Sequence, residues 1–278
     1  MKSGLTLLFV AILSIAQSFF MVGCKGNVQT PRGPSWQARA LEAYMIVKKR
    51  FSPSPSSLDV AWERANVESM AGMFKPMGAI QCDSVELAPE HPFPAAVEDA
   101  VAAYGWLLSQ GYAPGKVVVA GDSAGGNLAL ALLVYLRDRR RPLPAAAVCL
   151  SPNPDLTYSS ESWVFNSKKD VMIDARKERQ AVEIYLRGAD PRSPLASPYF
   201  ADLRGLPPLL IQVGSREVLL SDAMLFAEKA RLAGVEVTLE VWPGMQHEWH
   251  FAAKLMPEGR RAIARIGEFV EAVFRKSR

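Results

Sequence analysis

The feature that most constrains this chain is an apolar run that ends in a glycine-flanked serine and continues directly into a helix-forming stretch. Residues 117–126 read VVVAGDSAGG, and residues 127–133 read NLALALL. This pattern predicts a strand, a sharp turn and a helix, in which a G-x-S-x-G turn exposes the serine hydroxyl at the carboxyl end of the strand. The sequence therefore predicts Ser123 as a nucleophile, whereas the alternative is an ordinary glycine-rich turn that packs a helix on a sheet. The predicted turn comprises Gly121, Asp122, Ser123, Ala124, Gly125 and Gly126.

A serine nucleophile of this type needs a histidine base later in the chain, and the chain has 3 histidines. His91 precedes the serine and is in the wrong order. His247 and His250 follow the apolar run 235–242. We predict His247 as the base because it lies nearer the strand end, after a Pro-Gly turn, whereas His250 begins a predicted helix.

The acid that orients the base is expected on the turn after the preceding strand, residues 208–214. Two carboxylates are available there, Glu217 and Asp222. Glu217 is three residues past the strand end and is the preferred acid. Asp222 falls at the start of the predicted helix 221–232, where dipole and capping effects explain an acidic side chain.

Other classes of chemistry are not indicated. His247 and His250 are spaced i, i+3, whereas metalloprotease helices place histidines at i and i+4, so neither a metal site nor a cofactor is expected. The net charge of +4 is small for 278 residues, and no basic block predicts nucleic-acid binding. Cys82 and Cys149 show no redox or metal spacing and are expected to pack as small hydrophobes. The sequence carries no signal for an oligomeric state.

Several segments together resemble the bacterial hormone-sensitive-lipase-like esterases, an α/β-hydrolase family, from about residue 35 to the C-terminus. They are LAPEHPFPAAVED at 87–99, GDSAGG at 121–126, Ser151-Pro152 with Asp155-Leu156, EVLL at 217–220 and GMQH at 244–247. The resemblance implies a carboxylic-ester hydrolase for short or medium acyl chains, with a small-molecule ester as its substrate. It makes Ser123 the nucleophile, Glu217 the acid, His247 the base and the backbone N–H of Ala124 an oxyanion donor.

One departure from the family pattern concerns the rest of the oxyanion hole. Family members carry His-Gly-Gly-Gly upstream of the LAPE segment, and this sequence contains no such motif. Residues 78–86 instead resemble the family's first strand, running directly into that segment. We interpret this as an internal loss of several tens of residues, which predicts a shortened sheet with strand 116–120 at or near its edge. The alternative function is therefore a weakly active or inactive hydrolase-fold protein, either a binder or a damaged gene product.

Strands and helices alternate beyond residue 94, which predicts a parallel sheet flanked by helices, with the site at the carboxyl ends of its strands. The expected helices are 95–110, 127–139, 172–186, 221–232 and 257–275, and the expected strands are 116–120, 145–150, 209–213 and 235–242. Residues 79–278 are thus assigned to an α/β-hydrolase catalytic domain. Apolar residues between Trp36 and Phe74 recur at helical spacing, which predicts helices in residues 35–78. The resemblance implies that these helices form a lid over the site, and the alternative is that they cover the core.

The N-terminus reads as a separate unit. A lysine at position 2 precedes an apolar stretch from Leu5 to Val22 that ends at Gly23-Cys24, as in a secretory signal. Residues 21–24 resemble a bacterial lipoprotein box, which makes Cys24 the expected lipidated residue and residues 24–34 a linker. The alternative for residues 1–23 is an uncleaved membrane anchor. Both interpretations attach the protein to a membrane. The lipoprotein interpretation places it in the cell envelope, outside the cytoplasm. The alternative location is the cytoplasm.

Overall fold

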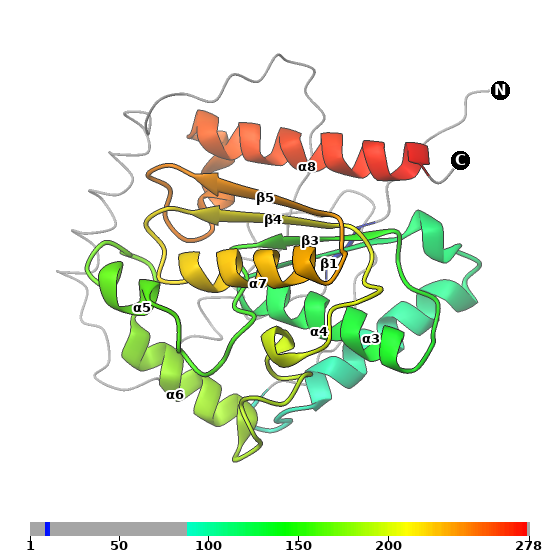
Figure 1. The fold of residues 1–278 in the computed structure, drawn as a ribbon, viewed down its shortest axis with the longest axis horizontal. Coiled ribbons are helices and arrows are strands. Elements are labelled where there is room, and N and C mark those ends of the chain that lie inside the picture. Colours follow the sequence, from blue (N-terminus) through cyan, green and yellow to red (C-terminus); the bar gives the residue numbers. More distant parts are fainter. Residues whose placement is uncertain (1–8, 12–87, 277–278) are drawn as a thin grey trace.

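The fold is built on a parallel sheet, described here from a computed structural model that defines residues 9–11 and 88–276. The strands are β1 (Phe9–Ala11), β2 (Val118–Asp122), β3 (Ala146–Leu150), β4 (Leu209–Gly214) and β5 (Val237–Trp242). They lie in the order β1-β2-β3-β4-β5, and every neighbouring pair is parallel. The carboxyl ends of β2 to β5 therefore meet along one edge (Figure 1).

Helices cover both faces of this sheet. On one face lie α3 (Ala95–Ser109), α4 (Ala124–Asp138) and α7 (Leu220–Leu232), and on the other lies α8 (Pro257–Lys276) (Figure 1). Alternation along the strands explains the two layers, because successive strand residues point to opposite faces. Val119, for example, joins the core with α3, α4 and α7, whereas Val118 packs with Ile266 and Val270 of α8.

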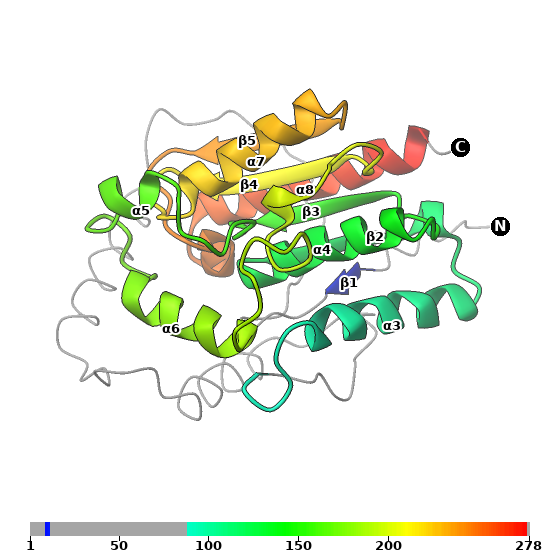
Figure 2. The same cartoon turned by 60° about the horizontal axis from the view of Figure 1, so that its bottom comes forward.

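Shorter elements gather near the carboxyl edge of the sheet. They are α5 (Ser162–Phe165), α6 (Ala175–Leu186) and the 3-10 helix η3 (Trp249–Lys254), while two other 3-10 turns are η1 (Pro114–Lys116) and η2 (Pro198–Phe200). Asp174 caps α6 by accepting hydrogen bonds from the N–H groups of Arg176 and Lys177. Figure 2 shows α5 and α6 beyond the ends of the strands, opposite the end at which α3 terminates.

The α/β fold predicted from the sequence is confirmed, with element boundaries shifted by up to three residues, and two of these shifts concern the serine turn. β2 continues through Asp122 because Gly121 and Asp122 pair with Cys149 and Leu150 of β3. Helix α4 begins at Ala124 rather than Asn127. Pairing with a neighbouring strand extends β2 into the turn residues, and local sequence propensity does not predict such pairing.

Strand β1 comes from the segment that the sequence assigns to a signal. Phe9–Ala11 pair with 118–120 of β2, so β2 is one strand in from the edge of the described sheet. A short apolar run suits a strand as well as the middle of a signal segment, and periodicity does not separate the two. The predicted lid, linker and Cys24 lie outside the described residues. Within the part of the chain that the structure describes, no helix combines the length and the apolar character needed to cross a bilayer.

Candidate active site

Ser123 occupies a strained turn between β2 and α4. Its φ and ψ are 52° and −121°, in a region that side-chain-bearing residues rarely adopt. Two glycines make room for this turn. A Cβ on Gly121 would lie 2.1 Å from the carbonyl oxygen of Gly125, and one on Gly126 would lie 2.8 Å from Cβ of Pro152. The sequence needs glycine at these two positions because the turn brings strand, helix and the neighbouring loop into contact.

Backbone hydrogen bonds fix the position of the serine. Its N–H donates to the carbonyl of Leu150 at 2.8 Å, and its own carbonyl accepts from the N–H groups of Asn127 at 3.2 Å and Asn153 at 3.3 Å. Ala124 is the first residue of α4 and is exposed. An N–H in the first turn of a helix has no partner within that helix and favours negative charge, so Ala124 suits the role of an oxyanion donor.

Glu217 follows the end of β4 and is completely buried. Its Oε1 accepts hydrogen bonds from the Ser151 hydroxyl at 2.8 Å and from the N–H of Gly214 at 2.5 Å. Its Oε2 lies 3.0 Å from Nδ1 of His247. Burial raises the pKa of Glu217, while the hydrogen bonds from His247, Gly214 and Ser151 act in the opposite direction. The carboxylate is thus fixed in one orientation, toward the imidazole.

Side chains from the α5 region anchor the loop that carries Glu217. The amide of Asn166 donates to the carbonyl of Glu217 at 2.8 Å and to that of Ser215 at 3.2 Å. The N–H of Val218 donates to the buried carboxylate of Asp170 at 3.0 Å. These contacts hold the loop without using the Glu217 side chain, which is left to face His247.

His247 lies on the loop after β5 and is 8% exposed. Its Nδ1 faces Glu217, and its Nε2 lies 3.4 Å from Oε1 of Glu248. Burial lowers the pKa of the imidazole, but the charge of Glu248 and the hydrogen bonds of both carboxylates outweigh it and raise the pKa well above its usual range. Among the described residues, no hydrogen bond joins the Ser123 hydroxyl to Nε2. The predicted acid and base are therefore paired, whereas the serine and the base are not yet hydrogen-bonded.

The two alternative residues lie in structural contacts. Asp222 is 2% exposed in the first turn of α7, and its Oδ2 accepts from Nε1 of Trp163 at 2.9 Å. His250 lies in η3, where its Nε2 is 2.8 Å from Oε1 of Gln212, and burial lowers its pKa to about 3. The imidazole of His250 is therefore neutral at physiological pH. His91 is exposed on the segment before α3.

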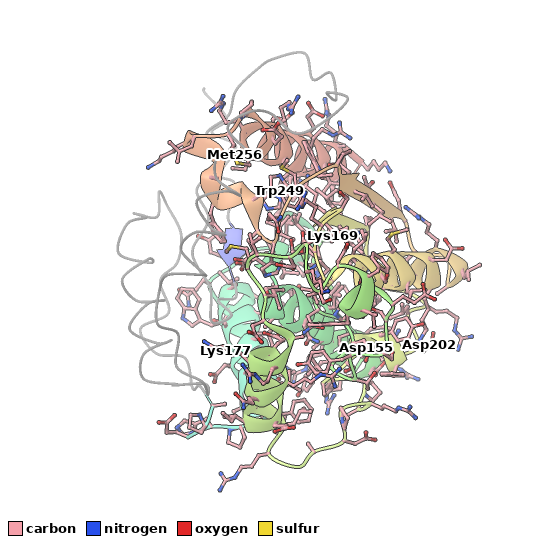
Figure 3. The ribbon with its side chains drawn as sticks, turned by 90° about the vertical axis from the view of Figure 1, so that its left-hand side faces the viewer. Asp155, Lys169, Lys177, Asp202, Trp249 and Met256 are labelled. Atoms are coloured by element: carbon pink, nitrogen blue, oxygen red, sulfur yellow. The ribbon has the colours of Figure 1, made fainter. Side chains whose placement is uncertain are left out.

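Sequence reasoning missed the residues that support Glu217 and His247. Ser151 is fully buried with φ 45° at the end of β3, and its hydroxyl bridges the carboxylate of Glu217 and the N–H of Glu248, the latter at 3.4 Å. The available signals were that Ser151 follows a buried strand and that Glu248 directly follows the predicted base. Figure 3 looks onto this region, with Lys177 of α6 below and Trp249 of η3 above.

No group of three or more His, Cys, Asp or Glu side chains in the described ranges has the arrangement of a metal site. Cys149 is buried in β3, where burial raises the pKa of its thiol to about 12. It contributes to the apolar core rather than to the site. Cys82 lies outside the described residues.

Comparison with known proteins relates the site to ester hydrolases. Residues 84–251 match the model of a family described as alpha/beta hydrolase fold. An acetyl-hydrolase of Streptomyces hygroscopicus is 56% identical over 182 residues, which cover 66% of this chain and 61% of the relative. An esterase of Acinetobacter venetianus RAG-1 is 40% identical over 188 residues, which cover 67% of this chain and 62% of that relative. The chain thus spans about three fifths of the length of these curated relatives.

The fold also matches solved structures. One is an esterase from the bacterial hormone-sensitive lipase family, with 36% identity and a TM-score of 0.77 over 86% of this chain and 99% of that chain. The 36% identity means that this chain is similar to that esterase in sequence as well as in fold.

Proposed function

We propose that this chain, which belongs to the hormone-sensitive-lipase-like esterases of the α/β-hydrolase fold family, is a serine carboxylesterase for short- or medium-chain esters. Ser123 attacks the ester carbonyl and passes its proton to Nε2 of His247, forming a tetrahedral intermediate. His247 then donates this proton to the leaving alcohol, which gives the acyl-enzyme. A water molecule then attacks the acyl-enzyme and gives its proton to His247, which returns it to the oxygen of Ser123 as the carboxylic acid leaves. Glu217 keeps the imidazole oriented throughout.

The observation that carries this proposal is the contact between Glu217 and His247. Their atoms are 3.0 Å apart, although the residues come from the ends of two different strands, and Ser123 lies at the end of a third. An orienting carboxylate on Nδ1 leaves Nε2 as the nitrogen that exchanges protons, which is the division of roles in Ser-His-acid hydrolases. The acetyl-hydrolase among the relatives supports a small acyl group as the substrate class.

The second candidate, a hydrolase-fold protein with weak or no activity, is supported by the absence of a His-Gly-Gly-Gly motif from the sequence. The N–H of Ala124 is one donor for the oxyanion, and loss of one further donor typically lowers turnover by about 10²- to 10³-fold. Residues 79–87, where a substitute loop would begin, lie outside the described residues. The two candidates share the same triad and differ in the oxyanion hole.

Hydrolysis of p-nitrophenyl acetate, butyrate and octanoate tests both candidates. We expect turnover that Ser123→Ala and His247→Ala each abolish, with unchanged circular dichroism. A matched control is Ser167→Ala, which removes an exposed hydroxyl that donates to the carbonyl of Val164. Activity that survives in Ser123→Ala would contradict the esterase assignment, and absence of any activity in the folded wild type would favour the second candidate.

We also propose that residues 1–23 act as a lipoprotein signal and that Cys24 carries the lipid, which would hold the enzyme on the outer side of a membrane. A single acyl chain gives only marginal anchoring, whereas the several chains of a lipoprotein hold a protein firmly. Support comes from the sequence pattern alone, whereas the pairing of Phe9–Ala11 with β2 counts against cleavage. An uncleaved anchor is the alternative, and the two differ in the mass of the native N-terminus.

A further inference from the structure

The imidazole of His247 lies between two buried carboxyl groups rather than one. Glu217 faces Nδ1 at 3.0 Å and Glu248 faces Nε2 at 3.4 Å. The exposed fractions of the two carboxyl-bearing residues are 0% and 7%. Water therefore contributes little to the solvation of these groups, and a charge on Glu248 acts strongly on the ring. Nε2 is the nitrogen that the proposed reaction requires for Ser123.

Glu248 has a buried partner on the nucleophile turn. Asp122, which directly precedes Ser123 and is 4% exposed, forms a side-chain hydrogen bond with Glu248. Burial, followed by the charge of Glu248, raises the pKa of Asp122 well above its usual range. Two carboxyl groups in contact cannot both ionise easily. Asp122 therefore keeps its proton and donates it to Glu248, so that the pair carries one negative charge, next to Nε2.

The backbone holds Glu248 in this position. Its φ and ψ are 52° and 36°, in the left-handed region that glutamate rarely occupies, and its N–H donates to the hydroxyl of Ser151 at 3.4 Å. A non-glycine residue keeps such a conformation only where its surroundings fix it. The strained residue directly after His247 thus aims a carboxylate at the working nitrogen of the ring.

We propose that Glu248, held by Asp122, is a positioning residue that binds the Nε2–H of protonated His247 and competes with Ser123 for this nitrogen. The inference rests on the proposed esterase function. In the resting enzyme both imidazole nitrogens face carboxylates, Nδ1 that of Glu217 at 3.0 Å and Nε2 that of Glu248 at 3.4 Å. Before attack on an ester, Nε2 releases its proton to solvent and its lone pair turns to the hydroxyl of Ser123. Glu248 therefore sets the pH above which the enzyme becomes active.

Other titratable groups near His247 also bear on the charge of its imidazole. Glu217 and Asp122 are described above. Burial raises the pKa of Glu178 of α6, while the charge of His247 and a hydrogen bond with Asn153 act in the opposite direction. His250 is held neutral by burial and adds no positive charge. Of these groups, Glu248 is the one that contacts Nε2.

The test is a titration of His247 by imidazole NMR in the whole protein, which needs no catalytic activity. The chain has 3 histidines, and His247→Gln assigns the signals by removing one set. We expect the wild-type His247 to titrate well above the ordinary value of about 6.5. Glu248→Gln is expected to lower this pKa by at least about one pH unit, because an opposite charge within contact distance shifts a pKa by about 1–3 units. A wild-type His247 that titrates at or below about 6.5 would overturn the proposal.

Two further variants sharpen the result. Asp122→Asn leaves the Glu248 carboxylate in place with an amide donor beside it, so we expect the pKa of His247 to stay high. If Asp122→Asn lowers this pKa as far as Glu248→Gln does, the charge lies on Asp122 and the assignment to Glu248 is wrong. Glu228→Gln removes an exposed carboxylate from α7 and controls for net charge. We expect it to leave the titration of His247 unchanged.

A kinetic readout distinguishes positioning from a merely structural role. In Glu248→Gln the rise of kcat/KM with pH is expected at lower pH, which gives about tenfold more activity wherever the wild-type base is mostly protonated. The plateau at high pH is expected to stay within about threefold of the wild type. Loss of kcat/KM at every pH would mean that Glu248 supports the fold or the reaction instead. If no variant hydrolyses esters, the NMR titration still decides the electrostatic proposal, while the esterase function fails separately.

Discussion

Asp222 offers a direct test of how burial acts in this protein. The side chain is 2% exposed in the first turn of α7 and accepts from Nε1 of Trp163 at 2.9 Å. Burial raises its pKa from 3.8 to about 7, although hydrogen bonds from Ser160 and Trp163 act in the opposite direction. The folded protein therefore keeps this carboxyl protonated at pH values where the unfolded chain has released the proton.

The sign and size of the effect follow from linkage. Between pH 4 and pH 7 the unfolded chain binds fewer protons at this position than the folded one, so the free energy of unfolding falls as pH rises. With pKa values of 3.8 and about 7, the contribution of Asp222 falls by roughly 2–3 kcal/mol between pH 5 and pH 8. Asp222→Asn removes this dependence, because an amide is uncharged at every pH and its oxygen can still accept from Trp163.

Urea unfolding followed by tryptophan fluorescence at pH 5, 6, 7 and 8 measures this difference. We expect the stability of Asp222→Asn relative to the wild type to rise by roughly 2–3 kcal/mol across this range. Glu228→Gln, which removes an exposed carboxylate from the same helix, is expected to show no such change. A stability difference between Asp222→Asn and wild type that stays constant within about 0.5 kcal/mol would refute the reasoning, because Asp222 would then be ionised in the folded state.

Three further predictions concern the acid, the nucleophile turn and the N-terminus. Glu217→Gln is expected to lower kcat/KM for p-nitrophenyl butyrate by on the order of 10²- to 10⁴-fold, while Asp222→Asn stays within about threefold; the reverse order would assign the acid to Asp222. Gly121→Ala is expected to cost more than about 3 kcal/mol or to prevent folding, since the new Cβ would lie 2.1 Å from the carbonyl oxygen of Gly125; wild-type stability in urea would contradict this. Mass spectrometry of the native protein is expected to find a lipidated N-terminus at Cys24, and an uncleaved N-terminus would disprove the signal.

The sequence could indicate where the candidate site lies because each of its residues follows a strand. Each of Ser123, Glu217 and His247 follows an apolar run, and parallel strands bring their carboxyl ends to one edge. The contact between Glu217 and His247 follows from the adjacency of β4 and β5. The choice of Glu217 over Asp222 agrees with this geometry, because Asp222 contacts Trp163 instead.

The supporting contacts were beyond sequence reasoning because they depend on tertiary packing. Glu248 reaches Asp122 only through a left-handed backbone conformation, which nothing in the local pattern GMQHEWH demands. Ser151 reaches Glu217 because β3 lies next to β4 and because its own φ is positive. Local propensity also ended β2 too early, since pairing with β3 extends the strand to Asp122.

The pH profile of the enzyme can separate the two features proposed to limit it. An incomplete oxyanion hole weakens stabilisation of the tetrahedral intermediate at every pH, so it lowers the whole profile, by about 10²- to 10³-fold for each missing donor. The carboxylate of Glu248 acts on the protonation of His247, so it lowers kcat/KM only below the pKa of the imidazole. The high-pH plateau therefore reports on the oxyanion donors, and the midpoint of the rise reports on Glu248. In Glu248→Gln the midpoint is expected to move while the plateau stays. A wild-type kcat at high pH near the value of about 10 s⁻¹ typical of enzymes would mean that a second segment completes the oxyanion hole beside Ala124.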